Sequence, residues 1–167
     1  MHRDVHLNVL LPRNRNHTGW IRIELDGRPQ REFRILGRGS TKVNGRPTGN
    51  STLSPLSYAG NTPTGDYVSP GIVSTADWDR DSYGPWGAVR LTAVAGEALL
   101  AARLGRKGLL IHGGAAGHFE GYRSTLGCLR LQNADMKTLI GMISGAGANA
   151  TAQMCEPVAV RVTVREW

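Results

Sequence analysis

Long apolar segments are missing from this sequence of 167 residues. No uninterrupted apolar run approaches the ~18 residues that a membrane-spanning helix requires. The N-terminus, MHRDVHLNVLLPRNRN, holds only a short apolar stretch, and it has no small-residue cleavage site of the kind that ends a signal peptide. We therefore expect a protein without a membrane span that does not enter the general secretory route by itself.

Cysteine is scarce, with Cys128 and Cys155 alone in the chain. A structural disulfide between the two is one interpretation, because exported proteins use such crosslinks. A zinc site that also includes His112 and His118 is another, although these residues lack the close paired spacing of structural zinc motifs. The third interpretation is that one cysteine is a reactive thiol, and the sequence around Cys128 favours it.

Acidic residues are outnumbered, and the resulting net charge of +7 is uneven along the chain. Residues 1–50 hold ten Lys and Arg against four Asp and Glu, whereas the remainder holds ten against nine. Such an excess favours an anionic partner, either nucleic acid or the polymers of a bacterial wall, or is simply a solvated basic surface. Helix-turn-helix and RNA-binding motifs are missing, so we do not expect a nucleic-acid partner.

Glycine, by contrast, is abundant at 22 residues, which favours a loop-rich β fold over a helical bundle. Val5–Leu11 is predicted to be the first strand, and apolar and polar residues alternate in Trp20–Leu25, the pattern of a strand with one buried face. Asp26–Gly27 predicts a tight turn that leads to another strand at Phe33–Leu36. Residues 1–36 are therefore predicted to contain a basic hairpin with one wet, arginine-rich face.

Two short helices and a terminal strand are predicted in the second half of the chain. The first helix is expected at Glu97–Arg103. The second, capped by Asn133 or Asp135, is expected to run to about Ile143, with its apolar residues on one face. Clean alternation of valines predicts a half-buried strand within residues 157–165.

Two long segments, residues 37–61 and 69–86, lack periodicity and are predicted to be loops. Long loops in compact domains are often functional. The second loop carries aromatic and acidic side chains, which either line a substrate groove or pack the loop onto the body. The predicted fold class is mainly β, a sandwich or partly closed barrel with one or two short helices. The whole chain, residues 1–167, is predicted to be one domain.

One histidine ends a predicted strand, and one cysteine precedes another strand sixteen positions later. The apolar run Leu109–Ile111 ends at His112, and Cys128 leads into Leu129–Leu131. Two strands connected in this way can pair, which would bring the imidazole and the thiol within reach. An adjacent imidazole takes the thiol proton and stabilises the thiolate, which is the nucleophilic form. Backbone N–H groups of Gly127 and Cys128 are predicted to form an oxyanion hole.

These residues resemble the signature of a known family. The sequence IHGG…STLGCLRLQNAD resembles the L,D-transpeptidase (YkuD-type) catalytic domain. That signature is a His–Gly pair, a spacer and Ser/Thr-x-Gly-Cys, followed by an apolar residue and often Arg. Upstream, Thr62–Tyr67 resembles the family's Thr-Pro-x-Gly segment, and the resemblance covers about residues 60–140. Many members have His before the Gly–Cys pair where this chain has Leu126, a difference that bears on substrate preference.

The resemblance implies a role for each matching residue. Cys128 is the acyl-accepting nucleophile, His112 is its base, and the Gly113 carbonyl orients the imidazole. The substrate-binding residues that it implies are Thr125, Gly127 and Arg130. The arginine matches the family residue that holds a substrate carboxylate, a task that suits a bidentate guanidinium.

The chemistry implied by the resemblance is acyl transfer on peptidoglycan stem peptides. The cysteine attacks the carbonyl after an L-centre and releases the terminal D-residue, and the acyl group then passes to an amine or to water. No metal or organic cofactor is expected, because thiolate, imidazole and backbone donors suffice. The expected location is the cell envelope or periplasm, reached by a specialised export route.

Two alternatives share this motif. One is a secreted antibacterial effector that uses the same site on a competitor's wall and has a secretion-system or immunity partner. The other is a non-catalytic cell-wall-binding module that kept the fold. Labelling of Cys128 by a thiol electrophile near neutral pH separates an enzyme from such a module.

Overall fold

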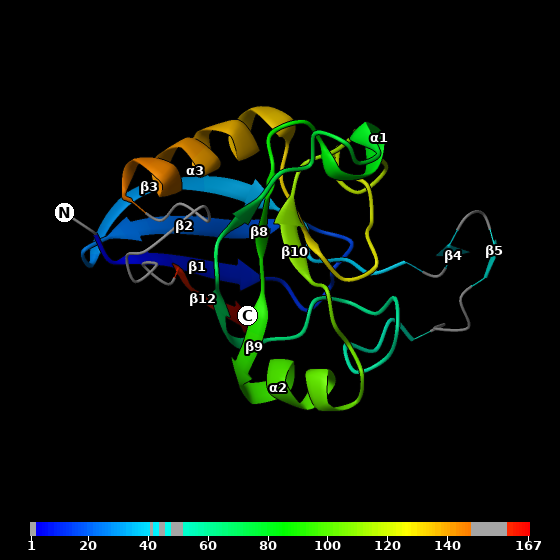
Figure 1. Ribbon diagram of the computed structural model, residues 1–167. Helices are drawn as coiled ribbons and strands as arrows, with labels where there is room; N and C mark the ends of the chain where they lie inside the picture. The colour runs from blue at the N-terminus through cyan, green and yellow to red at the C-terminus, as the bar shows by residue number, and fades with distance from the viewer. Residues whose placement is uncertain (1–2, 41, 44–45, 48–51, 148–159) are drawn as a thin grey trace.

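Two packed β-sheets form the body of the protein, as a computed structural model shows (Figure 1). The structure describes residues 3–40, 42–43, 46–47, 52–147 and 160–167. One core of buried apolar side chains is shared by both sheets and the longest helix. The predicted fold class is confirmed: the protein is mainly β, a two-sheet sandwich with a few short helices.

The larger sheet has six strands in the order β3-β2-β1-β12-β6-β9. Within it, β1 and β12 pair parallel, and the other neighbours pair antiparallel. Alternation explains the pairing, because every second residue of the central strands is buried in the core. Its strands are β1 (Val5–Leu11), β2 (Gly19–Leu25), β3 (Arg28–Ile35), β6 (Gly65–Ser69), β9 (Thr92–Ala95) and β12 (Val160–Glu166).

The N-terminal hairpin forms where its sequence predicted, but its second strand is longer. Asp26 and Gly27 both have positive φ, 53° and 72°, as a two-residue hairpin turn requires. β3 therefore begins directly after the turn instead of at Phe33. Its first five residues are all exposed, because β3 is an edge strand, and they carry no alternation that a sequence pattern could detect.

The smaller sheet has four strands in the order β11-β10-β8-β7, and β10 and β11 run parallel. Its strands are β7 (Ile72–Val73), β8 (Ala88–Arg90), β10 (Leu110–His112) and β11 (Leu129–Arg130). A third, two-stranded sheet joins β4 (Lys42–Val43) and β5 (Arg46–Pro47).

The two segments predicted to be loops are thus not wholly irregular. Residues 37–61 contain β4 and β5, and residues 69–86 contain β7 and the short helix α1 (Arg80–Tyr83). Strands of two residues are too short to show a period. Part of the predicted terminal strand, residues 157–159, lies outside the described residues.

Two longer helices cover the sheets. α2 (Gly96–Arg103) lies near β9, and α3 (Asn133–Gly145) lies along the six-stranded sheet over β2 and β3 (Figure 1). α3 buries Met136, Leu139 and Ile143 on one face, as predicted. The predicted cap is wrong, because the N-cap is Gln132 without a side-chain cap bond. In the described residues, no helix is long and apolar enough to cross a membrane.

Truncating the buried face of α3 should destabilise the protein strongly. Leu139 is fully buried, so Leu139→Ala should lower the free energy of unfolding by about 2–5 kcal/mol. Leu100 on α2 is 48% exposed, and Leu100→Ala should change it by less than about 0.5 kcal/mol. Urea denaturation of both variants measures the two changes in the free energy of unfolding. Equal changes would contradict the burial of this face of α3.

Candidate active site

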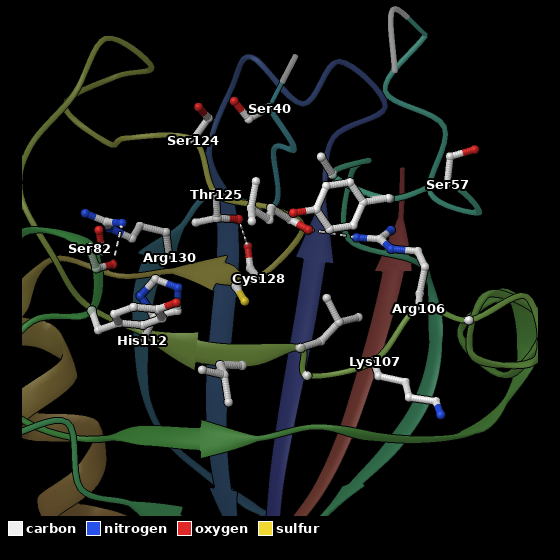
Figure 2. A pocket seen from close by; sticks show the side chains of 18 of the residues that line it. Ser40, Ser57, Ser82, Arg106, Lys107, His112, Ser124, Thr125, Cys128 and Arg130 are labelled. Atoms are coloured by element: carbon white, nitrogen blue, oxygen red, sulfur yellow. Dashed lines mark hydrogen bonds between the residues drawn. The ribbon is translucent and has the colours of Figure 1, made fainter. Parts of the chain in front are cut away.

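The parallel pairing of β10 with β11 places the predicted reactive residues on one face. Ile111 pairs with Leu129, and His112 pairs with Arg130. Because alternate residues of a strand share a face, Cys128, two residues before Arg130, faces the same side as His112. All three polar side chains line one cavity of about 860 Å³. In Figure 2 the Cys128 sulfur points to the side on which the His112 ring lies.

His112 is held in one tautomer by its neighbour. Its Nδ1 lies 2.6 Å from the Gly113 carbonyl oxygen. A carbonyl only accepts hydrogen bonds, so Nδ1 carries the proton and Nε2 is left as the basic nitrogen. The imidazole is 2% exposed, and this burial lowers its pKa to about 4. The histidine is therefore neutral at neutral pH.

An aromatic pair covers His112, and its residues come from the segment that the sequence predicted only as a loop. The Tyr83 ring lies 5.1 Å from the imidazole, tilted by 49°. Trp78 packs edge-on against Tyr83 at 5.0 Å. α1 therefore shields the histidine from water, which is consistent with its lowered pKa.

Cys128 is a free, half-buried thiol, so the interpretation as a disulfide with Cys155 is wrong. Cys155 itself lies outside the described residues. Burial raises the pKa of the Cys128 thiol to about 11, although the charges of Arg106 and Arg130 act in the opposite direction. The expectation that the imidazole stabilises a thiolate at rest is therefore not met, and the resting pair is neutral thiol and neutral imidazole. Among described residues, no group of three or more His, Cys, Asp or Glu could hold a metal ion.

The turn before Cys128 is closed by hydroxyl groups. Thr125 Oγ1 donates to the Cys128 carbonyl at 2.8 Å and accepts from the Gly127 N–H at 3.0 Å. Thr62 Oγ1 donates to the Gly127 carbonyl at 2.7 Å. The Gly127 N–H is therefore engaged within the turn and is not free for an oxyanion, which corrects half of the expected donor pair.

Arg106 packs against this turn, although its sequence context gave no sign of it. The guanidinium is buried and donates to the carbonyls of Pro55, Gly60, Asn61 and Leu126. Gly127 has a φ of 110°, and a Cβ there would overlap Arg106 Nη2. Glycine is thus required by both backbone conformation and space. No local pattern marks Arg106, because its acceptors lie 20 to 51 residues away along the chain.

Arg130 is also committed to backbone carbonyls. It is 2% exposed, and it donates to Ser82, Asp81 and Ala115 at 3.0, 3.0 and 2.8 Å. Burial, together with the charge of Arg123, lowers its pKa to about 10. The arginine joins α1 to the loop that follows His112. Its predicted role as a carboxylate ligand stays a prediction.

The cavity is positively charged. Its lining includes the charged side chains Arg106, Lys107, Arg123 and Arg130, and no Asp or Glu lines it in the described part of the chain. The acidic residues of the 69–86 segment do not line it, and Asp79 instead caps α1. The prediction that those acids line a substrate groove is therefore not supported for this cavity. Of that segment's aromatic residues, Tyr83 lines the cavity.

Comparison with known proteins assigns the family. Residues 20–162 match the L,D-transpeptidase catalytic domain (YkuD) family. This chain belongs to that family. The match spans both His112 and Cys128 and extends well beyond the 60–140 region of sequence resemblance. No curated protein matches the chain.

Several solved structures resemble this chain in fold, although their sequence identity to it is low. Bd1075 of Bdellovibrio bacteriovorus is 14% identical, with a TM-score of 0.52, over 96% of this chain and 47% of its own. An L,D-transpeptidase (residues 123–326) from Xylanimonas cellulosilytica is 19% identical, with a TM-score of 0.48, over 99% and 62%. An L,D-transpeptidase from Mycobacterium smegmatis is 14% identical, with a TM-score of 0.48, over 98% and 59%. The chain thus spans about half to three fifths of these proteins.

Because the thiol and the imidazole are both neutral at rest, the rate of Cys128 alkylation should depend strongly on pH. The thiolate is the nucleophile, and its fraction grows about tenfold per pH unit below the thiol pKa. With that pKa raised to about 11, alkylation by iodoacetamide should rise steadily from pH 6 to pH 9. The measurement is the rate in a Cys155→Ala background, with the site of modification mapped by mass. A rate that levels off near pH 6 would indicate a thiolate–imidazolium pair instead.

Proposed function

We propose that this protein is a cysteine-dependent L,D-transpeptidase that acts on peptidoglycan stem peptides through an acyl-enzyme on Cys128. One observation carries the proposal: Cys128 and an imidazole whose basic Nε2 is left free share one sheet face and one cavity. The family match across both residues supports it. The acyl acceptor is either an amine of a neighbouring stem or water.

Acylation requires one proton to move in each half of the step. As the Cys128 sulfur attacks the substrate carbonyl, its proton passes to His112 Nε2, and a C–S bond forms. When the tetrahedral intermediate collapses, the C–N bond breaks and His112 returns the proton to the leaving amine of the D-residue. Because both groups rest neutral, proton transfer accompanies attack and does not precede it.

Deacylation reverses these roles. His112 takes a proton from the incoming amine or water, the acceptor attacks the thioester, and the C–S bond breaks to restore the thiol. The Cys128 N–H is left for the developing oxyanion, because it has no other hydrogen-bond partner in the described part of the chain and Thr125 engages that of Gly127. Gly113 and Thr125 act as positioning groups for the base and the nucleophile.

Product analysis tests this function. Incubation with isolated stem peptides should yield peptides that lack the terminal D-residue or are joined to an acceptor, both resolved by mass spectrometry. Cys128→Ala should abolish the products while the protein stays folded. His112→Ala should lower the rate by about 10²–10⁴-fold, and the double variant should match Cys128→Ala, because both residues serve one step. Absence of products from the folded protein would favour the wall-binding module.

The cationic lining predicts a preference for anionic ligands in the cavity. Lys107 and Arg123 are exposed cations on its walls. Cys128 should therefore react faster with iodoacetate, relative to iodoacetamide, than a free thiol does. Lys107→Ala or Arg123→Ala should lower that ratio by roughly two- to fivefold, the effect of one charge several ångströms away near a surface.

Lys137→Ala is the matched control for that preference. Lys137 lies over the Trp86 ring and does not line the cavity. Its removal changes the net charge equally and should leave the ratio unchanged. If all three variants shift the ratio alike, overall charge and not the cavity selects the anion.

A further inference from the structure

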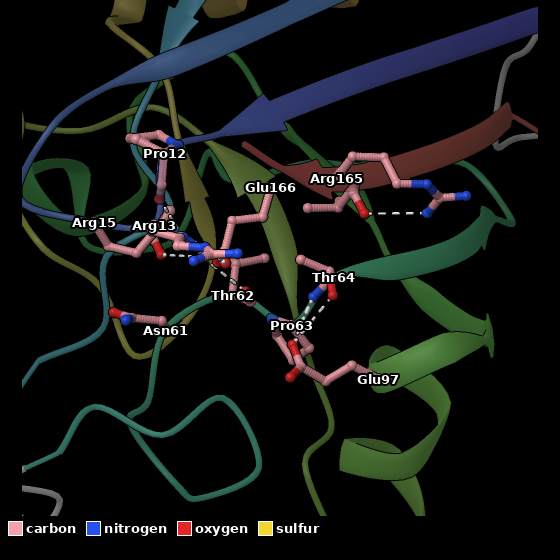
Figure 3. Close-up of polar contacts among 12 residues, drawn as sticks. Pro12, Arg13, Arg15, Asn61, Thr62, Pro63, Thr64, Glu97, Arg165 and Glu166 are labelled. Carbon is pink, nitrogen blue, oxygen red and sulfur yellow. Dashed lines mark hydrogen bonds and ion pairs between the residues drawn. The ribbon is translucent and has the colours of Figure 1, made fainter.

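The connection between β1 and β2, Pro12–Thr18, contacts the loop after His112 directly and the Cys128 turn through one intervening residue. It precedes residue 20, where the family match begins, so the family signature assigns it no role. Figure 3 shows Pro12 and Arg15 of this connection beside Thr62, from the segment that packs under the nucleophile turn. Three separate contacts lead from this connection to the cavity.

The first contact is made by Arg15, which is 5% exposed. Its Nη1 donates to the carbonyls of Thr62 at 2.9 Å and Gly37 at 3.2 Å, and its Nε donates to the Pro12 carbonyl. Its Nη2 pairs with the Glu166 carboxylate at 2.8 Å. Each nitrogen of the buried guanidinium is thus hydrogen-bonded, and Nη1 fixes the backbone of Thr62.

Thr62 transmits this position to the nucleophile. It is fully buried, and its hydroxyl donates to the Gly127 carbonyl, one residue before Cys128. Arg15 is therefore linked to the Cys128 turn through one intervening residue. Displacement of Thr62 would break the hydrogen bond from its hydroxyl to the Gly127 carbonyl, which stabilises the turn before Cys128.

The second contact runs through Asn16. Its side-chain oxygen accepts from Arg38 Nε at 2.7 Å. The Arg38 carbonyl accepts the N–H of Thr125, the residue that closes the turn onto the Cys128 carbonyl. The Arg38 guanidinium also lies 4.0 Å over the Phe119 ring, in the loop that follows His112.

The third contact joins Thr18 to Glu120, at the tip of the loop after His112. The Thr18 N–H and hydroxyl both donate to Glu120 Oε2, at 2.5 and 2.6 Å, and His17 lies 3.3 Å from Oε1. These bonds lower the pKa of the Glu120 carboxyl to about 2. The backbone of Glu120 has a φ of 54°, a conformation that non-glycine residues seldom adopt.

We infer that the β1–β2 connection is a positioning element for the active site, acting through Arg15 on the Cys128 turn and through Thr18 on the loop after His112. It holds the Cys128 turn and the loop after His112 in place relative to each other, and so limits the access of water to the thiol. This inference concerns the geometry around Cys128, and its test does not depend on the proposed peptide substrate.

A matched pair of variants in a Cys155→Ala background tests it. Arg15→Lys keeps the charge but cannot donate in four directions, whereas Arg13→Lys changes an arginine whose side chain is 86% exposed. In Arg15→Lys the loosened turn should admit water, so that the pH profile of Cys128 alkylation moves to lower pH. The rate at pH 7 should rise about tenfold for every pH unit by which the profile moves, while peptide turnover falls. Arg13→Lys should retain the profile of the parent.

Loss of stability alone would lower the melting temperature without moving the profile of the folded protein. Superimposable profiles for Arg15→Lys, Arg13→Lys and the parent would therefore overturn the inference. If the parent has no peptide turnover, the proposed function fails, but the alkylation profiles still decide this question.

Thr18 supplies a second test, which also holds if Arg15→Lys does not fold. Thr18→Val removes one of the two bonds to Glu120 and keeps the side-chain volume, so it should move the alkylation profile in the same direction. Thr18→Ser retains the hydroxyl and should restore the parent profile. Equal profiles for the valine and serine variants would contradict a positioning role for Thr18.

Discussion

The parallel register of β10 and β11 is the constraint on which the site depends. It sets His112 beside Arg130 and therefore sends the Cys128 side chain to the same face. The two strands are buried in the core shared by both sheets, which fixes their orientation. A slip of one residue would turn the thiol to the opposite face from the imidazole. The arrangement of the candidate site thus follows from the packing of a five-residue strand pair.

Desolvation is the second consequence of that packing. The same burial that aligns the pair lowers the pKa of His112 and raises that of Cys128, so neither group is charged at rest. Arg106 and Arg130 lie close enough for their charges to favour a thiolate, and both guanidinium groups are hydrogen-bonded to backbone carbonyls. In the proposed reaction, charge that develops during attack would meet these cations in a sheltered cavity, where electrostatic stabilisation is strongest.

Much of this arrangement follows from local sequence. Val5–Leu11 was predicted as a strand with the bounds of β1, Asp26–Gly27 located the hairpin turn, and the glycine-flanked His112 and Cys128 indicated the candidate site. Long-range contacts could not be predicted from local sequence. Nothing near Arg106 or Arg15 predicts their carbonyl partners, which come from segments brought together only by the fold. Asn133 was predicted as a helix cap, but its side chain accepts the Gly114 N–H at 2.7 Å, because the loop after His112 passes the helix start. Short elements such as β7 hold too few residues to show a period.

The proposed mechanism requires Cys128 to carry the acyl group. Its most direct test is the mass of the intact protein, quenched in acid during reaction with a stem peptide and then digested to locate the adduct. The protein should gain the mass of the peptide without its terminal D-residue, and the gain should be confined to the fragment that contains Cys128. Turnover with no adduct, or with the adduct on another residue, would contradict it.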